Sequence, residues 1–391
     1  MSLRNLLLAA FACMMLQCVS RGSNDDFKEE IAALKMFPDE PAAPIQLWDG
    51  QVIVAKYDQA GPRYYRIDHL KSEQFDVPGL RQILSVSYGK DKAVVLGRYA
   101  GELRLLHSHG AIIETVPLPS ALKKAKSPWL IPSTDAIAVV DDRTMYQYKD
   151  GSWTHLVIPK VPKFNKEFKP EHLGYKQYLY GSKLFAGWNA GEWGGMLAVL
   201  DLDHPNRGWK QVSGKKLGDQ SGIIGNIGIS GMTVDGSGSL WVSEGCCHMG
   251  GMWRGLYRYD GKLWETIVHG AFDKSEGGKI SFPGETTDVV DVFAVPDGKV
   301  YVLGGALGVF RYDGQGLNPI VEINFYGISQ PHFKMLPGRK IDTIIPCYPT
   351  GLVGDAKGNL YVSTGYYGIL CFVPDGKKYH LKQIVLPGAK E

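Results

Sequence analysis

The chain has 391 residues, and its 43 Lys and Arg residues against 40 Asp and Glu residues leave a net charge of +3. This near balance argues against a nucleic-acid binder that relies on a broad basic field. Hydrophobic residues make up 44% and charged residues 21%, which excludes a disordered chain, a coiled coil, a collagen and a multi-pass membrane protein. The 48 glycines and the 11% of aromatic residues instead indicate many short strands joined by tight turns.

Residues 1–20 have the pattern of a secretory signal peptide. Arg4 precedes an apolar run over residues 6–19, and the polar stretch SRGSNDDFKEE follows it. The apolar run is too short to span a bilayer comfortably. Cleavage after Ala12 or after Ser20 would release an exported protein, which we expect in the periplasm, at the cell surface or in the medium.

A lipid anchor is the alternative to release. Cys13 or Cys18 could be the lipidated cysteine of a bacterial lipoprotein, although neither follows residues of the Leu-Ala-Gly type that such a cysteine prefers. We expect contact with a membrane only through such an anchor.

Residues 21–40 are expected to form an N-terminal extension with a short helix. In the stretch FKEEIAALKMF, from Phe27 to Phe37, apolar residues recur at helical spacing. This helix should pack on the outside of the domain that follows it, or tether that domain to the N-terminus.

The rest of the chain, residues 41–391, repeats a pattern of four short strands. Three C-terminal units align: GMTVDGSGSLWVSEG with GLYRYDGKLWETIV, VFAVPDGKVYVLGG with GVFRYDGQGLNPIV, and GLVGDAKGNLYVSTG with GILCFVPDGKKYHLKQIV. Asp-Gly and Lys-Gly turns between alternating apolar runs are typical of β-hairpins. Four antiparallel strands per unit describe one blade of a β-propeller.

The same pattern continues through the N-terminal half and predicts seven blades. The first turns of the units fall near Asp49, Gly89, Ser133, Gly181, Gly236, Asp297 and Lys357. We therefore expect an all-β protein with a single β-propeller domain of seven four-stranded blades. A β-sandwich, or two separate sheets, would not explain hairpins that recur in this way.

The repeats DGSGSLWVSEG and GLYRYDG resemble those of the two-component regulator propellers and, more loosely, those of lactonase-like propellers. The resemblance is good over residues 231–375 and weak elsewhere. It covers the propeller part alone and implies a fold rather than a chemistry. A sensor role for a separate kinase follows from this resemblance only.

The unequal lengths of the connections predict a binding face. If the strands of a blade are named A to D from the axis outwards, the B–C loops and the D–A connections lie on one face. Most of the long connections in this sequence are D–A connections. Because loops on a rigid scaffold hold binding groups, we expect the loop-rich face around blades four to seven to bind a ligand.

Two adjacent B–C loops suggest a metal site. When LFAGWNAGEWGGM and LWVSEGCCHMGGM are aligned on their first leucines, Glu192 falls opposite His248, and Glu244 falls opposite Trp188. A carboxylate beside an imidazole can act as an acid–base pair or ligate a metal. With Glu244 added, the set could hold a divalent cation, either calcium or zinc. The same side chains could instead be solvated or bond to the neighbouring loop.

Other candidate ligand-binding residues lie in the long connections and loops. His332 and Arg339 belong to a basic D–A connection that could meet an anion near the central opening or simply be solvated. Trp193 is one of several aromatic residues in B–C loops, which suit stacking on a sugar or a peptide. The others are Trp188, Trp253, Tyr366 and Tyr367, of which several should pack between blades.

Four cysteines follow the leader. Cys371 lies in the strand-like run GILCFVPDG and is expected to be a buried small apolar residue. Cys347 could pair with Cys246 or Cys247, since disulfides form in exported proteins. The chain has no CxxC pair, which argues against a structural zinc site.

The motifs leave two classes of function open. There is no GxSxG elbow, P-loop or HExxH motif. The leading hypothesis is an exported propeller that binds a protein, small-molecule or carbohydrate ligand, and no nucleic acid. The alternative is an extracytoplasmic hydrolase or lyase of the lactonase-like kind, with a divalent cation held by Glu192, Glu244 and His248.

Overall fold

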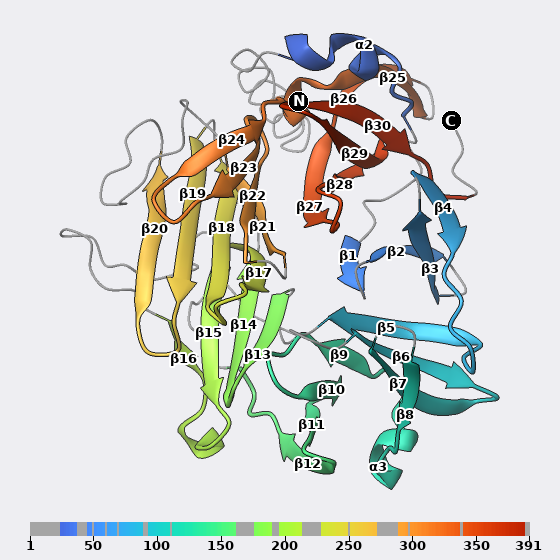
Figure 1. Ribbon diagram of the computed structural model, residues 1–391, viewed down its shortest axis with the longest axis vertical. Helices are drawn as coiled ribbons and strands as arrows, with labels where there is room; N and C mark the ends of the chain where they lie inside the picture. Colours follow the sequence, from blue (N-terminus) through green and yellow to red (C-terminus); the bar gives the residue numbers. More distant parts are fainter. Residues whose placement is uncertain are drawn as a thin grey trace.

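A ring of seven β-sheets forms the body of the molecule (Figure 1). The computed structural model describes residues 24–36, 45–48, 51–58, 61–68, 70–88, 93–109, 112–161, 176–189, 195–212, 228–248, 251–271, 288–295, 298–336 and 339–387. Within these ranges the sheets are four-stranded, antiparallel blades, so the predicted all-β propeller of seven blades is confirmed.

Each blade consists of four strands that are consecutive in the chain, and no blade in the described ranges borrows a strand from another. Blade 1 comprises β1 (Ile45–Trp48), β2 (Gln51–Asp58), β3 (Gly61–Asp68) and β4 (Lys71–Gln74), and blade 2 comprises β5 (Gln82–Tyr88), β6 (Ala93–Tyr99), β7 (Glu102–His109) and β8 (Ile112–Val116). Blade 3 comprises β9 (Trp129–Ile131), β10 (Ile137–Asp141), β11 (Thr144–Lys149) and β12 (Ser152–Val157). Blade 4 comprises β13 (Lys176–Tyr180), β14 (Lys183–Asn189), β15 (Gly195–Asp201) and β16 (Lys210–Gln211). Blades 5 to 7 comprise β17 (Ile229–Val234), β18 (Leu240–His248), β19 (Gly251–Tyr259), β20 (Trp264–Ala271); β21 (Val289–Ala294), β22 (Val300–Gly304), β23 (Gly308–Tyr312), β24 (Leu317–Val321); and β27 (Tyr348–Gly354), β28 (Leu360–Gly365), β29 (Gly368–Asp375), β30 (Lys378–Ile384).

The first strands of the blades line the central channel. They contact one another in chain order, from β1 through β5, β9, β13, β17 and β21 to β27, and β27 returns to β1. Apolar side chains fill the space between neighbouring blades. Blades 4 and 5, for example, enclose Phe185, Leu197, Val242 and Tyr257. The core is therefore a series of interfaces between blades, which leaves the axis of the ring to other side chains.

A single aspartate organises the first turn of blade 5. Asp235 Oδ1 accepts hydrogen bonds from the backbone N–H groups of Ser237 (2.9 Å) and Ser239 (3.0 Å), and its Oδ2 accepts one from Trp241 Nε1 (2.7 Å). Gly238 has a φ of +84°, in the left-handed region that favours glycine. One carboxylate thus ties the turn to the indole of the next strand. Blade 7 repeats this arrangement with Asp355, Lys357, Asn359 and Tyr361.

The N-terminal segment packs on the outside of the ring, as the sequence predicts. Its helices are η1 (Asp25–Phe27) and α2 (Lys28–Ala32), so the helical part is shorter than the stretch from Phe27 to Phe37. Phe27 is buried and meets Phe372 edge-on, with 5.7 Å between the ring centroids. The side chain of Gln383 accepts from the N–H of Lys35 (2.9 Å) and donates to its carbonyl (2.6 Å). These contacts hold the extended residues after the helix against β30.

The same segment also reaches the connection between blades 6 and 7. Asn24 Nδ2 donates to the carbonyl of Asn324 (3.3 Å), and the N–H of Asn324 donates to Asn24 Oδ1 (2.9 Å). Where blade 1 meets blade 7, Ser72 Oγ donates to the Val385 carbonyl (2.9 Å) and Lys56 Nζ to the Pro387 carbonyl (3.1 Å). Side chains thus close the ring between blades 1 and 7, and the N-terminal segment joins blade 7 to the connection that precedes it.

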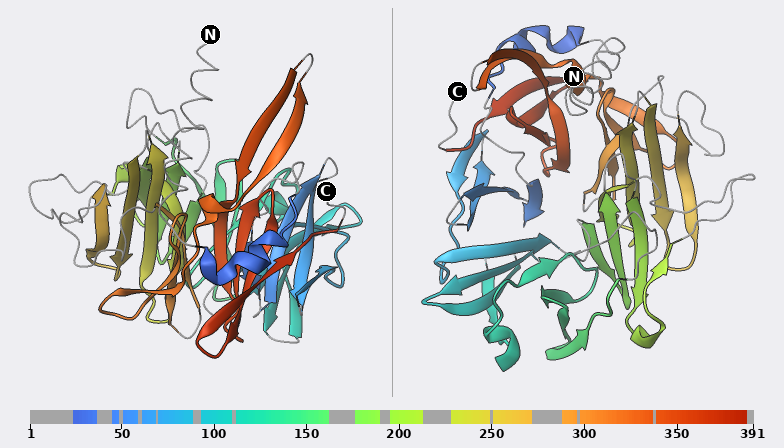
Figure 2. Two further views of the ribbon diagram at one scale, coloured as in Figure 1. Left: turned by 90° about the horizontal axis from the view of Figure 1, so that it is seen from above. Right: turned by 180° about the vertical axis from the view of Figure 1, so that it is seen from behind.

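Three connections contain structure that the repeats do not predict. The connection after blade 2 holds α3 (Ser120–Lys123), and short 3-10 helices, η3 (Pro205–Arg207) and η4 (Phe325–Gly327), lie within and after blades 4 and 6. Between blades 6 and 7, β25 (Ser329–Leu336) and β26 (Arg339–Pro346) form a separate hairpin that projects from the body of the ring (Figure 2). No helix in the described ranges is long and apolar enough to cross a membrane.

We predict that the N-terminal segment stabilises the ring. Phe27→Ala should lower the free energy of unfolding by about 3 kcal/mol, because it removes a buried ring from the cluster around Phe372. The control Glu29→Ala changes an exposed residue of the same helix and should shift it by no more than about 0.5 kcal/mol. Urea denaturation measures both free energies of unfolding. If Phe27→Ala is as stable as wild type, the contact of the segment with blade 7 does not stabilise the ring.

Candidate functional site

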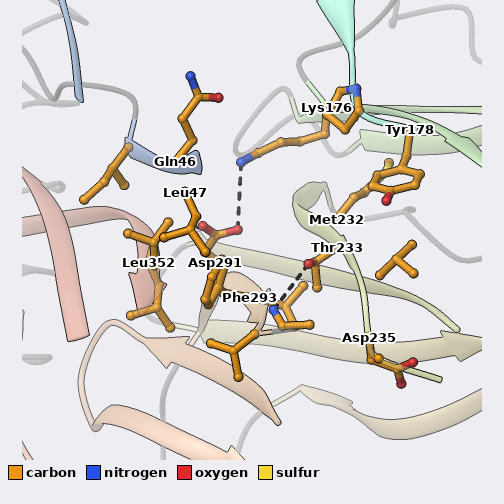
Figure 3. A pocket seen from close by; sticks show the side chains of 18 residues that line it. Gln46, Leu47, Lys176, Tyr178, Met232, Thr233, Asp235, Asp291, Phe293 and Leu352 are labelled. Carbon is orange, nitrogen blue, oxygen red and sulfur yellow. Dashed lines mark hydrogen bonds and ion pairs between the residues drawn. The ribbon is translucent and has the colours of Figure 1, made fainter. Parts of the chain in front are cut away.

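The central channel contains a cavity of about 310 Å³. Its walls come from the innermost strands β1, β13, β17, β21 and β27 and from Pro132, which follows β9, so six blades contribute to it. Most lining side chains are apolar, among them Leu47, Tyr178, Met232, Phe293 and Leu352. Figure 3 shows these residues around the two charged side chains that face each other in the cavity.

One of these charges is the carboxylate of Asp291 on β21. Its Oδ2 accepts a hydrogen bond from the backbone N–H of Leu352 on β27 (3.0 Å). Its other side faces Gly231 on β17, where an added Cβ would lie 2.3 Å from Oδ1. Gly351 on β27 also leaves room, since its Cβ position is 3.6 Å from Oδ2. Blades 5 and 7 therefore enclose a carboxylate that belongs to blade 6.

The position of Asp291 is fixed by a β-bulge that recurs around the ring. The register between the first two strands shifts just before Ser85, Gly231, Asp291 and Gly351, which are equivalent positions of blades 2, 5, 6 and 7. Bulges re-aim side chains at the rims of barrels and next to functional sites. In blade 2 the equivalent Ser85 makes the same kind of bond, because its Oγ accepts from the N–H of Leu130 in the next blade (3.1 Å).

The second charge is the ammonium of Lys176, the first residue of β13. Its Nζ lies 3.8 Å from Asp291 Oδ1, so the pair joins blade 4 to blade 6, which are not neighbours in the ring. The Asp291 side chain is 12% exposed, whereas that of Lys176 is 39% exposed. Burial raises the pKa of Asp291 above its usual value, and the nearby Lys176 opposes this shift. The carboxylate thus depends on Lys176 far more than the ammonium depends on Asp291.

A second cavity, of about 470 Å³, lies between blades 2 and 3. Its charged residues Lys149 and Asp135 are already paired at 2.5 Å, and both side chains are at least 40% exposed. His107, also on its wall, is paired with Glu114 at 2.6 Å. These charged groups are already paired with one another, so they are poorer binding groups for a ligand than the buried carboxylate in the central channel.

The predicted metal ligands fall only partly within the described residues. Glu244 lies on β18 and is 1% exposed, opposite Gly255 of β19. It is hydrogen-bonded with the Tyr257 hydroxyl, and burial together with this carboxylate raises the pKa of Tyr257 well above its usual value. Glu192 and the side chain of His248 lie outside the described residues. The described residues contain no group of three potential metal ligands, and the site of Glu192, Glu244 and His248 stays a prediction.

The other predicted ligand-binding residues are placed by their backbone only. His332 pairs with Thr343 and Leu336 with Arg339 in the β25–β26 hairpin. This basic segment is therefore a projecting hairpin rather than an irregular connection (Figure 2). The side chains of His332 and Arg339 lie outside the described part, as does Trp193 altogether.

The aromatic residues and cysteines that are described pack in the core. Trp188 is buried on β14 against Trp209, with ring centroids 6.4 Å apart, and Tyr367 is fully buried. The prediction that several of the loop aromatics pack between blades is thus confirmed for these two. Cys371 is buried as predicted, and Cys347 is a free, buried thiol in the structure. The side chains of Cys246 and Cys247, with which Cys347 could pair on the sequence alone, lie outside the described residues. Burial raises the pKa of the Cys347 thiol, which makes it unreactive.

Sequence reasoning missed Lys176 and Asp291. A signal for Asp291 exists in the repeats: GMTVDG, DVFAVPDG and GLVGDAKG align so that Asp291 replaces Gly231 and Gly351. A charge inside an apolar innermost strand, at a position where other repeats have glycine, indicates a group directed at the axis. Lys176 has no such signal, because it stands at the edge of its strand.

Comparison with known proteins shows the fold alone. No family model matches the chain, and no curated protein matches it. Among solved structures it is similar to YCF48 bound to D1 peptide (13% identity over 87% of this chain and 94% of that one, TM-score 0.44). It is also similar to the β-propeller domain of the Trilobed protease from Pyrococcus furiosus (12% identity, 88% and 97%, TM-score 0.41).

A third similar structure is the extracellular domain of a hybrid two-component system from B. thetaiotaomicron (13% identity, TM-score 0.32). The match covers 90% of this chain but only 47% of that one, so this chain spans about half of its length. All three are β-propellers, and what they bind or cleave is a property of those proteins.

We predict that Gly231 is required for its small size. Gly231→Ala would place a Cβ 2.3 Å from Asp291 Oδ1 and 2.7 Å from the Val292 backbone nitrogen, so blades 5 and 6 must shift. The expected loss of unfolding free energy is about 1–3 kcal/mol. Gly316→Ala is the matched control, because no atom lies within 4 Å of its Cβ position. Equal effects of the two substitutions in thermal or urea unfolding would contradict this role.

The buried charge predicts a pH-dependent effect of Asp291→Asn. Because the pKa of Asp291 is raised above 3.8 in the fold, its ionisation lowers stability as the pH rises from that value. Asparagine keeps the acceptor for Leu352 without ionising. The stability of the variant relative to wild type should therefore increase between roughly pH 4 and pH 7.

Urea denaturation at several pH values measures this difference. Glu73→Gln is the control, since Glu73 is an exposed carboxylate paired with Arg66 at 2.8 Å on the outside of blade 1. If the difference in the free energy of unfolding between Asp291→Asn and wild type stays constant, or shifts in favour of wild type as the pH rises, then burial does not disfavour the ionised form of Asp291.

Proposed function

We propose that the chain is an exported β-propeller binding module that holds a small polar ligand in its central channel, between Lys176 and Asp291. The observation that carries this proposal is the pair of opposite charges that meet, 3.8 Å apart, on the wall of a cavity in the ring. Binding sites are mostly apolar and contain a few polar groups that fix the orientation of the ligand. The cavity of about 310 Å³, with Lys176 facing Asp291 in it, fits this description.

The route of the chain supports access from the predicted loop-rich face of blades four to seven. Lys176 begins β13 directly after the long connection of residues 162–175, and β21 begins shortly after that of residues 272–287. Both charged groups therefore belong to innermost strands entered from long D–A connections. A ligand that approaches from this face meets the ends of these strands first.

The proposal of export rests on the N-terminal sequence. The apolar run after Arg4, with the polar stretch behind it, is typical of a leader. An exported protein meets the small molecules of its surroundings, which is consistent with a rigid ring that offers one internal site. A lipid anchor at Cys13 or Cys18 would add attachment to a membrane surface without changing the ring.

The described residues favour binding over metal-dependent catalysis. Glu244 would have to supply a metal ligand, but its carboxylate is buried between blades 4 and 5 and bonded with Tyr257. Metal ligation would break this buried contact. In the channel, by contrast, Lys176 is exposed enough to meet a ligand without disturbing an interface between blades.

We predict that a small polar compound stabilises the protein through Lys176. In a thermal-shift panel of amino acids, sugars, dicarboxylates and inorganic phosphate, at least one class should raise the Tm of wild type. A ligand at about 100 times its Kd adds about 2.7 kcal/mol, which amounts to several degrees. The shift should vanish in Lys176→Met and persist in Arg66→Met, the control at the exposed pair with Glu73.

Two results would contradict the proposed function. The first is a panel in which no class changes the Tm of wild type. The second is a shift that Lys176→Met retains in full, because the ligand would then bind outside the channel.

A further inference from the structure

The burial of Asp291 limits which ligands can enter the channel. Its side chain is 12% exposed, and the groups that face it are the Leu352 N–H, the glycine backbones of blades 5 and 7, and Lys176. Lys176 is the only cation that the described residues place beside it. Removing one partner of a buried ion pair is strongly destabilising, because an uncompensated charge remains. A ligand that draws Lys176 away must therefore offer Asp291 a cation of its own.

Lys176 is the half of the pair that can move. Its side chain is 39% exposed and flexible, and its ammonium is easily solvated. The separation of 3.8 Å between Nζ and Oδ1 exceeds the usual length of a hydrogen bond, so the two groups attract without being bonded directly. A small displacement of Lys176 would open the space between the charges.

A ligand with both charges satisfies both walls. Its ammonium can take the place of Lys176 at Asp291, and its carboxylate can bind the displaced Lys176. An anion alone would leave Asp291 unpaired. A neutral sugar would interrupt the attraction between the pair and put nothing charged in its place. The geometry of the pair thus selects a zwitterion.

The rest of the cavity specifies an apolar body for this ligand. Leu47, Tyr178, Met232, Phe293 and Leu352 line it. The polar lining residues besides the pair are Gln46, Thr233 and Asp235. The hydroxyl of Thr233 accepts from the Ala294 N–H (3.2 Å), and the Asp235 carboxylate is engaged within its own turn and by Trp241. Its volume of about 310 Å³ lies at the lower end of ligand pockets. The ligand should therefore be small and carry an apolar side chain beside its two charges.

We infer that the central channel binds a free α-amino acid with an apolar side chain, with its ammonium at Asp291 and its carboxylate at Lys176. This inference rests on the proposed function and gives it a ligand class. Asp291 and Lys176 determine the specificity of the site, because Asp291 binds the amino group and Lys176 binds the carboxylate.

Isothermal titration with three related probes tests the inference: L-leucine, N-acetyl-L-leucine and L-leucine amide. L-leucine should bind the wild-type protein. Loss of one partner from a buried charge pair weakens binding about 30-fold or more, so N-acetylation should have at least this effect. The amide should bind about 5-fold more weakly than leucine, since Lys176 is partly exposed and its contact with the carboxylate contributes about 1 kcal/mol at most.

The variants should reproduce the effects of the probes. Asp291→Asn should weaken leucine binding about 30-fold or more. Lys176→Met should also weaken leucine binding, and it should make the affinities for leucine and leucine amide equal. Glu73→Gln, the control at the exposed pair on blade 1, should leave all three affinities unchanged. Circular dichroism and the Tm of each variant confirm that it is folded before titration.

The outcomes separate this inference from the proposed function. If N-acetyl-leucine binds as tightly as leucine, the inference that the channel selects a zwitterionic ligand is wrong, and the channel is an anion site at Lys176. Absence of leucine binding, while another class of the panel stabilises wild type through Lys176, also overturns the inference but not the binding function. If no class of the panel binds, both fail.

Discussion

A carboxylate on the axis of the ring has to be compensated by groups from other blades, and the structure around Asp291 follows from this requirement. The N–H of Leu352 in blade 7 donates to the carboxylate, Gly231 in blade 5 leaves room for it, and Lys176 in blade 4 places its ammonium beside it. An unpaired buried charge is costly, so these contributions are linked. One side chain thus links blades 4 to 7 near the axis, in addition to the apolar interfaces between neighbouring blades.

The blades could be predicted from the sequence because their determinants are local. The carboxylates of Asp235 and Asp355 bind backbone N–H groups only two to four residues further on, and the repeats of the C-terminal half share such short turns. Alignment of the repeats placed Glu244 in a B–C loop, but it lies within β18, opposite Gly255 of β19. Its burial could not be predicted, because it is determined by Tyr257 on the next strand.

The channel could not be predicted for a similar reason. Lys176 and Asp291 are far apart in the sequence and belong to blades that are not neighbours, so no local pattern connects them. Only the closure of the ring brings β13 opposite β21. The shortened N-terminal helix likewise depends on its surroundings, since the contacts of Lys35 with Gln383 come from the far end of the chain. The interior of a propeller is thus specified by its topology more than by any single repeat.

The rigid ring and the movable lysine have separate roles in the proposed site. The bulge, the glycines and the backbone bond hold Asp291 in place before a ligand arrives, and such preorganisation lowers the cost of binding. Lys176 is long and partly exposed, so it can adjust to the ligand without moving a blade. This division explains how a closed β-propeller could admit a small molecule to its axis.

A crystal structure of the protein grown with an excess of L-leucine tests this account most directly. The account predicts electron density for the amino acid in the central channel, with its amino nitrogen within hydrogen-bond distance of Asp291 and its carboxylate beside Nζ of a displaced Lys176. An undisturbed Lys176–Asp291 pair above a cavity without density for leucine would contradict it.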